Sequence, residues 1–140
     1  SEVEQPDLNA QIVAEKIASS LERFGSKRFK GILHRSTEDS LNAGALGIEI
    51  KLSGKVPSAR AKTWRVFRGY LKKCGDVSIV GVDKAHTQAK LKTGVVGVKV
   101  SIMPPDIELP DKVTFIDKPE KVVEEVVEKK EEKGEKKRRE

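Results

Sequence analysis

The spacing of apolar residues changes at Gly44, and this change limits the folds open to the chain more than any other feature. Before Gly44, apolar residues recur every three or four positions, which is typical of amphipathic helices. After it, apolar and polar residues alternate, which is typical of strands with one buried face. Helices followed by strands in 140 residues, enough for one well-packed domain, indicate an α+β fold with two layers.

Two helices are predicted before this change. The first covers residues 6–25, with Asp7 as the expected N-cap, and the second covers residues 26–43, with Ser26 as its cap. Gly31 in the second helix costs about 1 kcal/mol relative to alanine, and the apolar face there is thin. The residues expected to face inward are Ala10, Val13, Ala14, Ile17, Leu21 and Phe24, followed by Phe29, Ile32, Leu33, Ser36 and Ser40.

Four consecutive antiparallel strands are predicted after the change, over residues 47–53, 60–71, 82–92 and 96–102. The two prolines at 104–105 end the last strand. The predicted fold is therefore α+β, with two helices packed on a four-stranded, mostly antiparallel sheet.

Positive charge is concentrated in the middle of the chain. Residues 25–110 contain sixteen Lys and Arg against seven Asp and Glu, a net charge of +9, whereas residues 1–24 are acidic and residues 111–140 are balanced. Such an imbalance attracts nucleic acid, anionic lipid or an acidic protein. We expect a domain over residues 1–110 and a charged, mostly disordered tail over residues 111–140. The alternative is a tail that forms a helix on a partner.

Membrane and secretory signals are not recognisable. No window approaches the roughly 18 consecutive apolar residues of a membrane helix, and the acidic N-terminus lacks the apolar segment of a signal peptide. We therefore expect a cytoplasmic protein without a membrane partner.

The glycine-rich segments do not match phosphate-binding loops. The run Ser53-Gly54-Lys55 resembles the end of a P-loop, but Glu49 stands where the first glycine is needed, and Val56 replaces the Ser or Thr that contacts magnesium. The segment Gly94–Gly97 leads into a strand, whereas a dinucleotide-binding motif leads into a helix. We expect no cofactor.

Candidate catalytic and metal-binding residues are sparse. His34 and His86 fall on different predicted elements, and the single cysteine, Cys74, excludes an internal disulfide and a Cys-based zinc cluster. A Cys–His nucleophile pair assembled by the fold stays open, although a half-buried Cys74 beside a turn is the favoured interpretation. We expect no metal site and no enzyme activity.

Basic residues on several predicted elements are the strongest functional signal. Cations on several elements can follow a phosphate backbone, and Trp64, Phe67 and Tyr70 on the second strand offer rings for stacking on unpaired bases. A solvated surface position is the simpler explanation for any one lysine. It does not explain the net charge of +9 over residues 25–110. The candidate RNA-binding residues are Lys27, Arg28, Lys30, His34, Arg35, Lys55, Arg60, Lys62, Arg65, Arg68, Lys72, Lys73, Lys84, Lys90 and Lys92.

Several runs, in order along residues 7–105, resemble a known family. They include Asp7–Gln11, Gly44–Glu49, Leu52–Lys55, Gly69–Asp76 and Gly94–Ile102. Together they resemble the C-terminal domain of small-subunit ribosomal protein three, and the run Tyr-Leu-Lys-Lys-Cys-Gly-Asp is similar to the archaeal type. The resemblance implies a two-helix, four-stranded domain in the head of the small subunit. Its implied partners are rRNA, mRNA near the channel where mRNA enters, and neighbouring head proteins.

The resemblance also limits the expected RNA contacts. Family members carry an N-terminal KH domain, and this chain begins where that domain would end, so KH-type recognition is not expected here. Bacterial members unwind mRNA with a motif whose positions here are Phe29, Lys30, Gly31 and His34. A glycine and a histidine that is mostly neutral at pH 7 replace two cations of that motif. The cations expected to supply charge from shifted positions are Lys27, Arg28, Lys30 and Arg35.

The predicted function is a non-enzymatic constituent of the small ribosomal subunit, on the ribosome in the cytoplasm, that binds rRNA and extends to mRNA where mRNA enters. Two alternatives stay open. One is an RNA-binding module that acts away from the ribosome. The other is a nuclease or lyase that uses the lysine-rich strands, for which the sequence offers no set of metal ligands.

Overall fold

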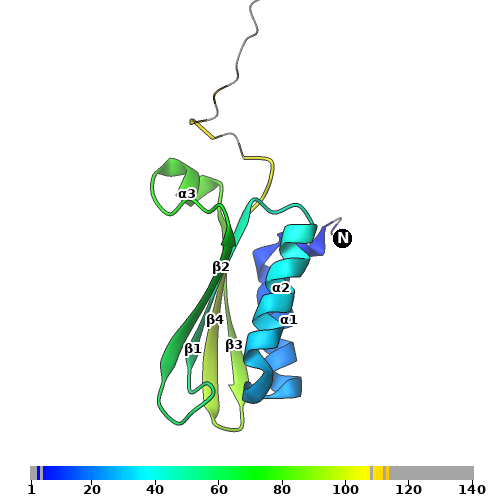
Figure 1. Cartoon of the computed structure of the whole chain (residues 1–140), viewed down its shortest axis with the longest axis vertical. Helices are drawn as coiled ribbons and strands as arrows, with labels where there is room; N and C mark the ends of the chain where they lie inside the picture. Colours follow the sequence, from blue (N-terminus) through cyan, green and yellow to red (C-terminus); the bar gives the residue numbers. More distant parts are fainter. Residues whose placement is uncertain (1–2, 4, 108, 112, 114–140) are drawn as a thin grey trace, which may run out of the picture. The chain divides into compact units, whose positions relative to one another are not determined.

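The computed structural model describes residues 3, 5–107, 109–111 and 113. Within them two long helices come first and the strands follow, with one short helix between the strands (Figure 1). The elements are the 3-10 turn η1 (Pro6–Leu8), α1 (Ala10–Phe24), the 3-10 turn η2 (Ser26–Arg28), α2 (Phe29–Asn42), β1 (Gly47–Gly54), β2 (Lys62–Gly69), α3 (Asp76–Val80), β3 (Asp83–Leu91) and β4 (Gly94–Met103). The strands form one antiparallel sheet in the order β2–β1–β4–β3. The predicted α+β fold is confirmed.

The core lies between the sheet and the helices α1 and α2, which cover the same face of the sheet (Figure 1). Helix positions three and four apart share one side, and alternate strand residues share one face, so both layers present apolar side chains inward. The apolar strand residues of this core are Ile48, Ile50, Leu52, Ala85, Ala89, Val96, Val98, Val100 and Ile102. Phe24 was wrongly predicted to face inward: it is 52 % exposed, because α1 ends there.

The helix α1 begins later than its sequence pattern predicts. Asn9, not Asp7, is the N-cap. Its side chain accepts hydrogen bonds from the backbone N–H groups of Gln11 and Ile12. Asp7 lies in η1, and its carboxylate pairs with Lys16 Nζ at 3.0 Å. The proline start signal therefore opens a 3-10 turn rather than the helix itself.

The helix α2 also begins later than predicted. Ser26 opens η2, and the helix proper starts at Phe29 without a side-chain cap from Arg28. The buried hydroxyls of Thr37 and Ser40 donate to carbonyl oxygens four residues earlier in the chain. These bonds allow the thin apolar face of α2 to pack on the sheet without leaving either hydroxyl unpaired.

The strands fall close to their predicted ranges, but one short helix was not predicted. β2 is shorter than residues 60–71, because the left-handed φ of 74° at Gly69 turns the chain and Tyr70 N–H then donates to the Leu46 carbonyl at 2.8 Å. The five-residue α3 follows in the connection from β2 to β3. Since β2 and β3 are the two edge strands, this connection leads from one edge of the sheet to the other.

Two sequence predictions concern the C-terminal residues. The tail over residues 111–140 lies almost wholly outside the described residues, so its disorder stays a prediction, as does the boundary at residue 110. The chain divides into Ser1–Leu109 and Pro110–Glu140, and the site below lies within the first unit. Among the described residues, no helix is both long enough and apolar enough to cross a membrane.

Candidate nucleic-acid interface

The open face of the sheet, meaning the face not covered by α1 and α2, carries a row of cations. Arg65 on β2 lies opposite Lys51 on β1, and Lys51 lies opposite Lys99 on β4. Lys99 in turn lies opposite His86 on β3. Because strand side chains alternate between faces and the flanking Val98 is buried in the core, Lys99 and its row project from the open face. The row therefore places three cations on β2, β1 and β4 and ends at His86 on β3.

Glu49 is a buried acid on this open face and is 5 % exposed. Its carboxylate accepts hydrogen bonds from Lys73 Nζ at 3.0 Å and from the guanidinium of Arg65. Lys51 Nζ lies 3.6 Å from the other carboxylate oxygen. One carboxylate is thus shared by three cations, and the four side chains together keep a positive charge.

The pKa of Glu49 results from opposing effects. Burial raises the pKa, because it disfavours the charged carboxylate. The hydrogen bonds from Lys73 and Arg65 and the positive charge of Lys51 act in the other direction and prevail, so the pKa lies below the ordinary value of 4.5. At neutral pH the carboxylate is ionised and orients the cations around it.

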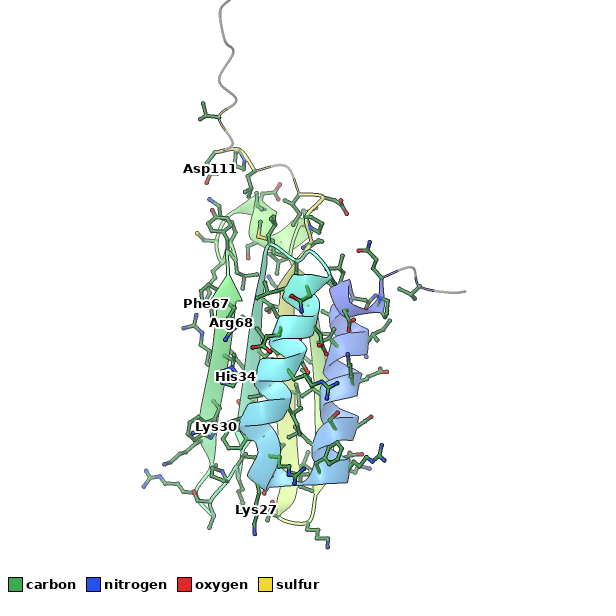
Figure 2. The ribbon with its side chains drawn as sticks, turned by 45° about the vertical axis from the view of Figure 1, so that its right-hand side comes forward. Lys27, Lys30, His34, Phe67, Arg68 and Asp111 are labelled. Carbon is green, nitrogen blue, oxygen red and sulfur yellow. The ribbon has the colours of Figure 1, made fainter. Side chains whose placement is uncertain are left out.

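A second group of cations lies on α2, beside the edge strand β2. Figure 2 shows Lys30 and His34 along this helix, with Arg68 on the neighbouring strand. Lys30 Nζ lies 5.4 Å from the centroid of the Trp64 ring, and Arg68 pairs with Glu38 of α2 at 3.4 Å. A groove of about 370 Å³ between the two elements is lined by Lys30 and His34. This surface faces a different direction from the row on the open face.

The three aromatic residues in and after β2 do not form the one stacking surface that the sequence suggested, and Trp64 takes the alternative place in the core. Trp64 faces the helices: its Nε1 donates to the Val56 carbonyl at 2.7 Å, and its ring centroid lies 5.1 Å from that of Phe29. Strand alternation places Trp64 and Phe67 on opposite faces. Phe67 and Tyr70 are 44 % and 46 % exposed, so these two rings remain accessible.

The other candidate cations are spread over further surfaces. Lys27, Lys90 and Lys92 line a hollow of about 490 Å³ at the C-terminal end of α1. Arg28 and Arg35 line a groove of about 560 Å³ between α1 and α2. The candidates in the β1–β2 connection and at its end are Lys55, Arg60 and Lys62, all exposed. The candidates that share the open face or its margin are Arg65, Lys72, Lys73, Lys84 and Lys90.

Lys51 and Lys99 belong to the open-face row but were missed as candidates from sequence. A signal was present, because each alternates with buried apolar neighbours and so has to point away from the helices. The pairing that brings them together depends on strand register, which the alternation alone does not fix.

The residues considered for metal binding or nucleophilic chemistry lie on separate elements. Among the described residues, no three His, Cys, Asp or Glu side chains gather as metal ligands. His34 lies on α2 and His86 on β3. Cys74 was predicted to be half-buried but is exposed, because it lies in the connection between β2 and α3 rather than in the core.

The fold and the open-face row define a basic α+β domain suited to a polyanionic partner. The family model described as "Ribosomal protein S3, C-terminal domain" matches residues 17–102. The chain belongs to this family, which confirms the resemblance seen in the sequence.

Archaeal relatives extend the match beyond that segment. The small ribosomal subunit protein uS3 of Methanococcus aeolicus is 46 % identical over 127 residues, covering 91 % of this chain and 60 % of the relative. The protein of the same name from Natronomonas pharaonis is 43 % identical over 136 residues, covering 91 % of this chain and 44 % of the relative. The chain thus spans about half the length of the curated relatives it matches.

Proposed function

We propose that this chain is a non-enzymatic constituent of the small ribosomal subunit and binds rRNA through its basic surfaces. Family membership and the names of the relatives support a place in the subunit. The observation that carries RNA binding is the row formed by Arg65, Lys51, Lys99 and His86. Like charges opposite each other destabilise a sheet, and a bound phosphate backbone offsets that repulsion.

The dimensions of the row suit a single RNA strand. Neighbouring strands of a sheet lie about 4.8 Å apart, so the row of four residues spans roughly 14 Å. In duplex DNA each strand presents one phosphate per about 3.4 Å of helix axis, and a backbone that lies along the row brings more than one phosphate within that span. The row therefore favours contact with the backbone over recognition of one particular base.

The second group of cations, on α2 beside β2, is proposed to reach mRNA near the channel where mRNA enters. In the resemblance to bacterial members, Lys30 and His34 fall at positions of the unwinding motif, whereas Gly31 lacks a charge. The nearby cations that add to this surface are Lys27, Arg28 and Arg35. In this proposal residues 1–110 form the rRNA-binding domain beside other proteins of the subunit head, residues 111–140 form a charged tail, and the complex is cytoplasmic.

Co-sedimentation tests the proposed place in the subunit. The 140-residue chain is mixed with small subunits that lack the corresponding protein and is pelleted at high salt. We expect the chain to remain with the subunit at salt concentrations that release it from free rRNA fragments. Equal release from both would instead indicate an RNA-binding module that acts away from the ribosome.

A cleavage assay tests the proposal that the chain is not an enzyme. A labelled structured RNA and a labelled DNA with an abasic site are incubated with the chain, with and without magnesium. We expect both to stay intact under both conditions. Cleavage that depends on the protein would establish a nuclease or lyase instead.

A further inference from the structure

A small hollow lies on the open face, between the sheet and the segment that joins β2 to β3. Its volume is about 280 Å³, and its lining includes Glu49, Lys51, Lys73, Lys84, His86 and Lys99. Pockets that enclose drug-sized ligands hold roughly 300–1,000 Å³. This hollow is therefore at the small end of ligand sites, and it has room for a phosphate group with its water.

Two contacts connect the wall of the hollow to the sheet. Lys73, which follows β2, donates to the Glu49 carboxylate at 3.0 Å. Lys84 on β3 donates to the backbone carbonyl of Ser78 in α3 at 2.6 Å. Because these contacts lie within the chain itself, the hollow is formed before any ligand enters, and a ligand loses less free energy to ordering the site.

The charges around the hollow are unbalanced. Glu49 is the one acid among the described residues that line it. Within the described part of the chain, Lys99 forms no ion pair, and the Lys84 ammonium binds Ser78 rather than an acid. Lys51 and Lys73 share Glu49 with Arg65. The surplus positive charge is directed into a small, partly enclosed space, which favours an anion.

We propose that this hollow binds one backbone phosphate of RNA and that Glu49 is its positioning residue. The proposal rests on the proposed function, since it names the partner chemistry of the same open face. Glu49 does not contact the phosphate. It accepts hydrogen bonds from Lys73 and Arg65 and lies beside Lys51, so that Lys73 and Lys51 stay at the wall of the hollow. Lys84 and Lys99 complete the set of cations around the anion.

The substitution Glu49→Gln tests this proposal, because the proposal and simple charge counting predict opposite changes in RNA affinity. On charge alone, removal of an acid from a basic surface strengthens RNA binding. If Glu49 positions the cations, its loss weakens binding, by about fivefold for one ordered phosphate contact. Glu15→Gln is the matched control, because Glu15 is exposed on α1 and its carboxylate is bonded to Gln11 in the same helix. We expect the control to bind RNA as tightly as the unchanged chain.

A second variant keeps the proposal testable if Glu49→Gln disturbs the fold. Lys99→Gln changes an exposed strand position, and we expect it to weaken RNA binding about threefold or more. In NMR spectra of the full chain, inorganic phosphate should shift the amide signals of Lys99 and His86 more than chloride at equal ionic strength. Lys99→Gln should remove that difference.

The outcomes of these experiments test the hollow proposal and the proposed function separately. Weaker binding by both variants, with phosphate-specific shifts, supports the hollow and the role of Glu49. If the unchanged chain binds RNA but Glu49→Gln strengthens binding and Lys99→Gln has no effect, the hollow proposal is wrong and the proposed function stands. If phosphate shifts the amide signals but both variants bind RNA as tightly as the unchanged chain, the hollow binds free phosphate and not RNA. If the unchanged chain does not bind RNA, the proposed function fails.

Discussion

Lys51 of β1 and Lys99 of β4 lie directly opposite each other in the sheet, although they are far apart in the sequence. Arg65 and His86 extend the same row to both edge strands. Like charges in this position weaken strand pairing by about 0.2–1 kcal/mol per pair. A local arrangement that opposes folding is expected where the side chains serve binding. The row therefore lowers the stability of the sheet at the residues proposed to bind RNA.

Replacement of Lys99 by threonine should make the protein more stable. Threonine suits a strand and removes the repulsion with Lys51, so we expect the free energy of unfolding to rise by about 0.5 kcal/mol at low salt. Urea unfolding at 20 mM and 1 M salt measures this gain, which should shrink at 1 M because salt screens exposed charges. Lys90→Thr is the control, since Lys90 lies opposite Val95. An equal gain for both variants would contradict the account.

The stability contributed by Glu49 should depend on pH in a defined direction. Because its pKa in the folded chain is lowered below 4.5, its contribution is fully present above pH 4.5 and is lost as the pH falls through the lowered pKa. At pH 7 we expect Glu49→Gln to be less stable by about 1–3 kcal/mol, the loss of charge-assisted hydrogen bonds.

Unfolding curves at pH 7 and pH 3 check this expectation. The difference between the unchanged chain and Glu49→Gln should narrow at the lower pH. Glu38→Gln serves as the control, because Glu38 is exposed and pairs with Arg68 at 3.4 Å on the surface. A difference for Glu49→Gln that stays constant with pH would show that packing, and not the charge, accounts for it.

Two glycines should respond in opposite ways to alanine. Gly31 lies inside α2, and a Cβ added there would meet no atom within 4 Å, so Gly31→Ala should stabilise the protein by about 0.5–1 kcal/mol. At Gly47, where β1 begins, a Cβ would collide with the backbone of Tyr70. Gly47→Ala should therefore destabilise the protein by at least about 1–3 kcal/mol. Thermal unfolding of the two variants measures both changes in stability. Changes of the same sign would contradict the close approach of Gly47 to the Tyr70 backbone.

Cations on and before α2 should matter more for RNA than cations near the C-terminus. Replacing Lys27, Arg28, Lys30 and Arg35 by Gln should weaken RNA binding more than tenfold, or about 1.4 kcal/mol. The comparison variant replaces Lys136, Lys137, Arg138 and Arg139, which lie in a segment with ten basic and ten acidic residues. Those acids cancel much of the field beyond roughly 8 Å. Fluorescence anisotropy with one structured RNA at one salt concentration compares the two variants, and a larger loss for the C-terminal variant would contradict the account.

Much of the fold could be predicted from the sequence, because apolar spacing reports which face of each element is buried. The change at Gly44 separates the helices from the strands for this reason. The helix α3 was missed because five residues, Asp76–Val80, are too few for a helical period to be visible. Asn9 and Asp7 are both acceptable N-caps in sequence, and only the folded chain shows which of them bonds to α1.

The candidate site was predicted less completely than the fold. Positive charge in the middle of the chain is visible in the composition, but its arrangement depends on strand pairing. The partners of Glu49 illustrate this: Lys73 and Arg65 come from positions 24 and 16 residues away and meet at one carboxylate. For Trp64 the sequence left both base stacking and a place in the core open, because it does not show that the ring packs on Phe29.

The salt dependence of RNA binding tests the central claim most directly, namely that the open-face row binds phosphates. Binding of one structured rRNA fragment is measured between 50 and 300 mM salt for the unchanged chain, for Lys51→Gln with Lys99→Gln, and for Lys16→Gln. Lys16 is the control because Asp7 and Asp39 already neutralise it. Each lost phosphate contact reduces the slope of log K against log salt by about 0.7–0.9. We predict a slope flatter by about 1.5 for the double variant and unchanged for Lys16→Gln, whereas the same slope for all three proteins would contradict the claim.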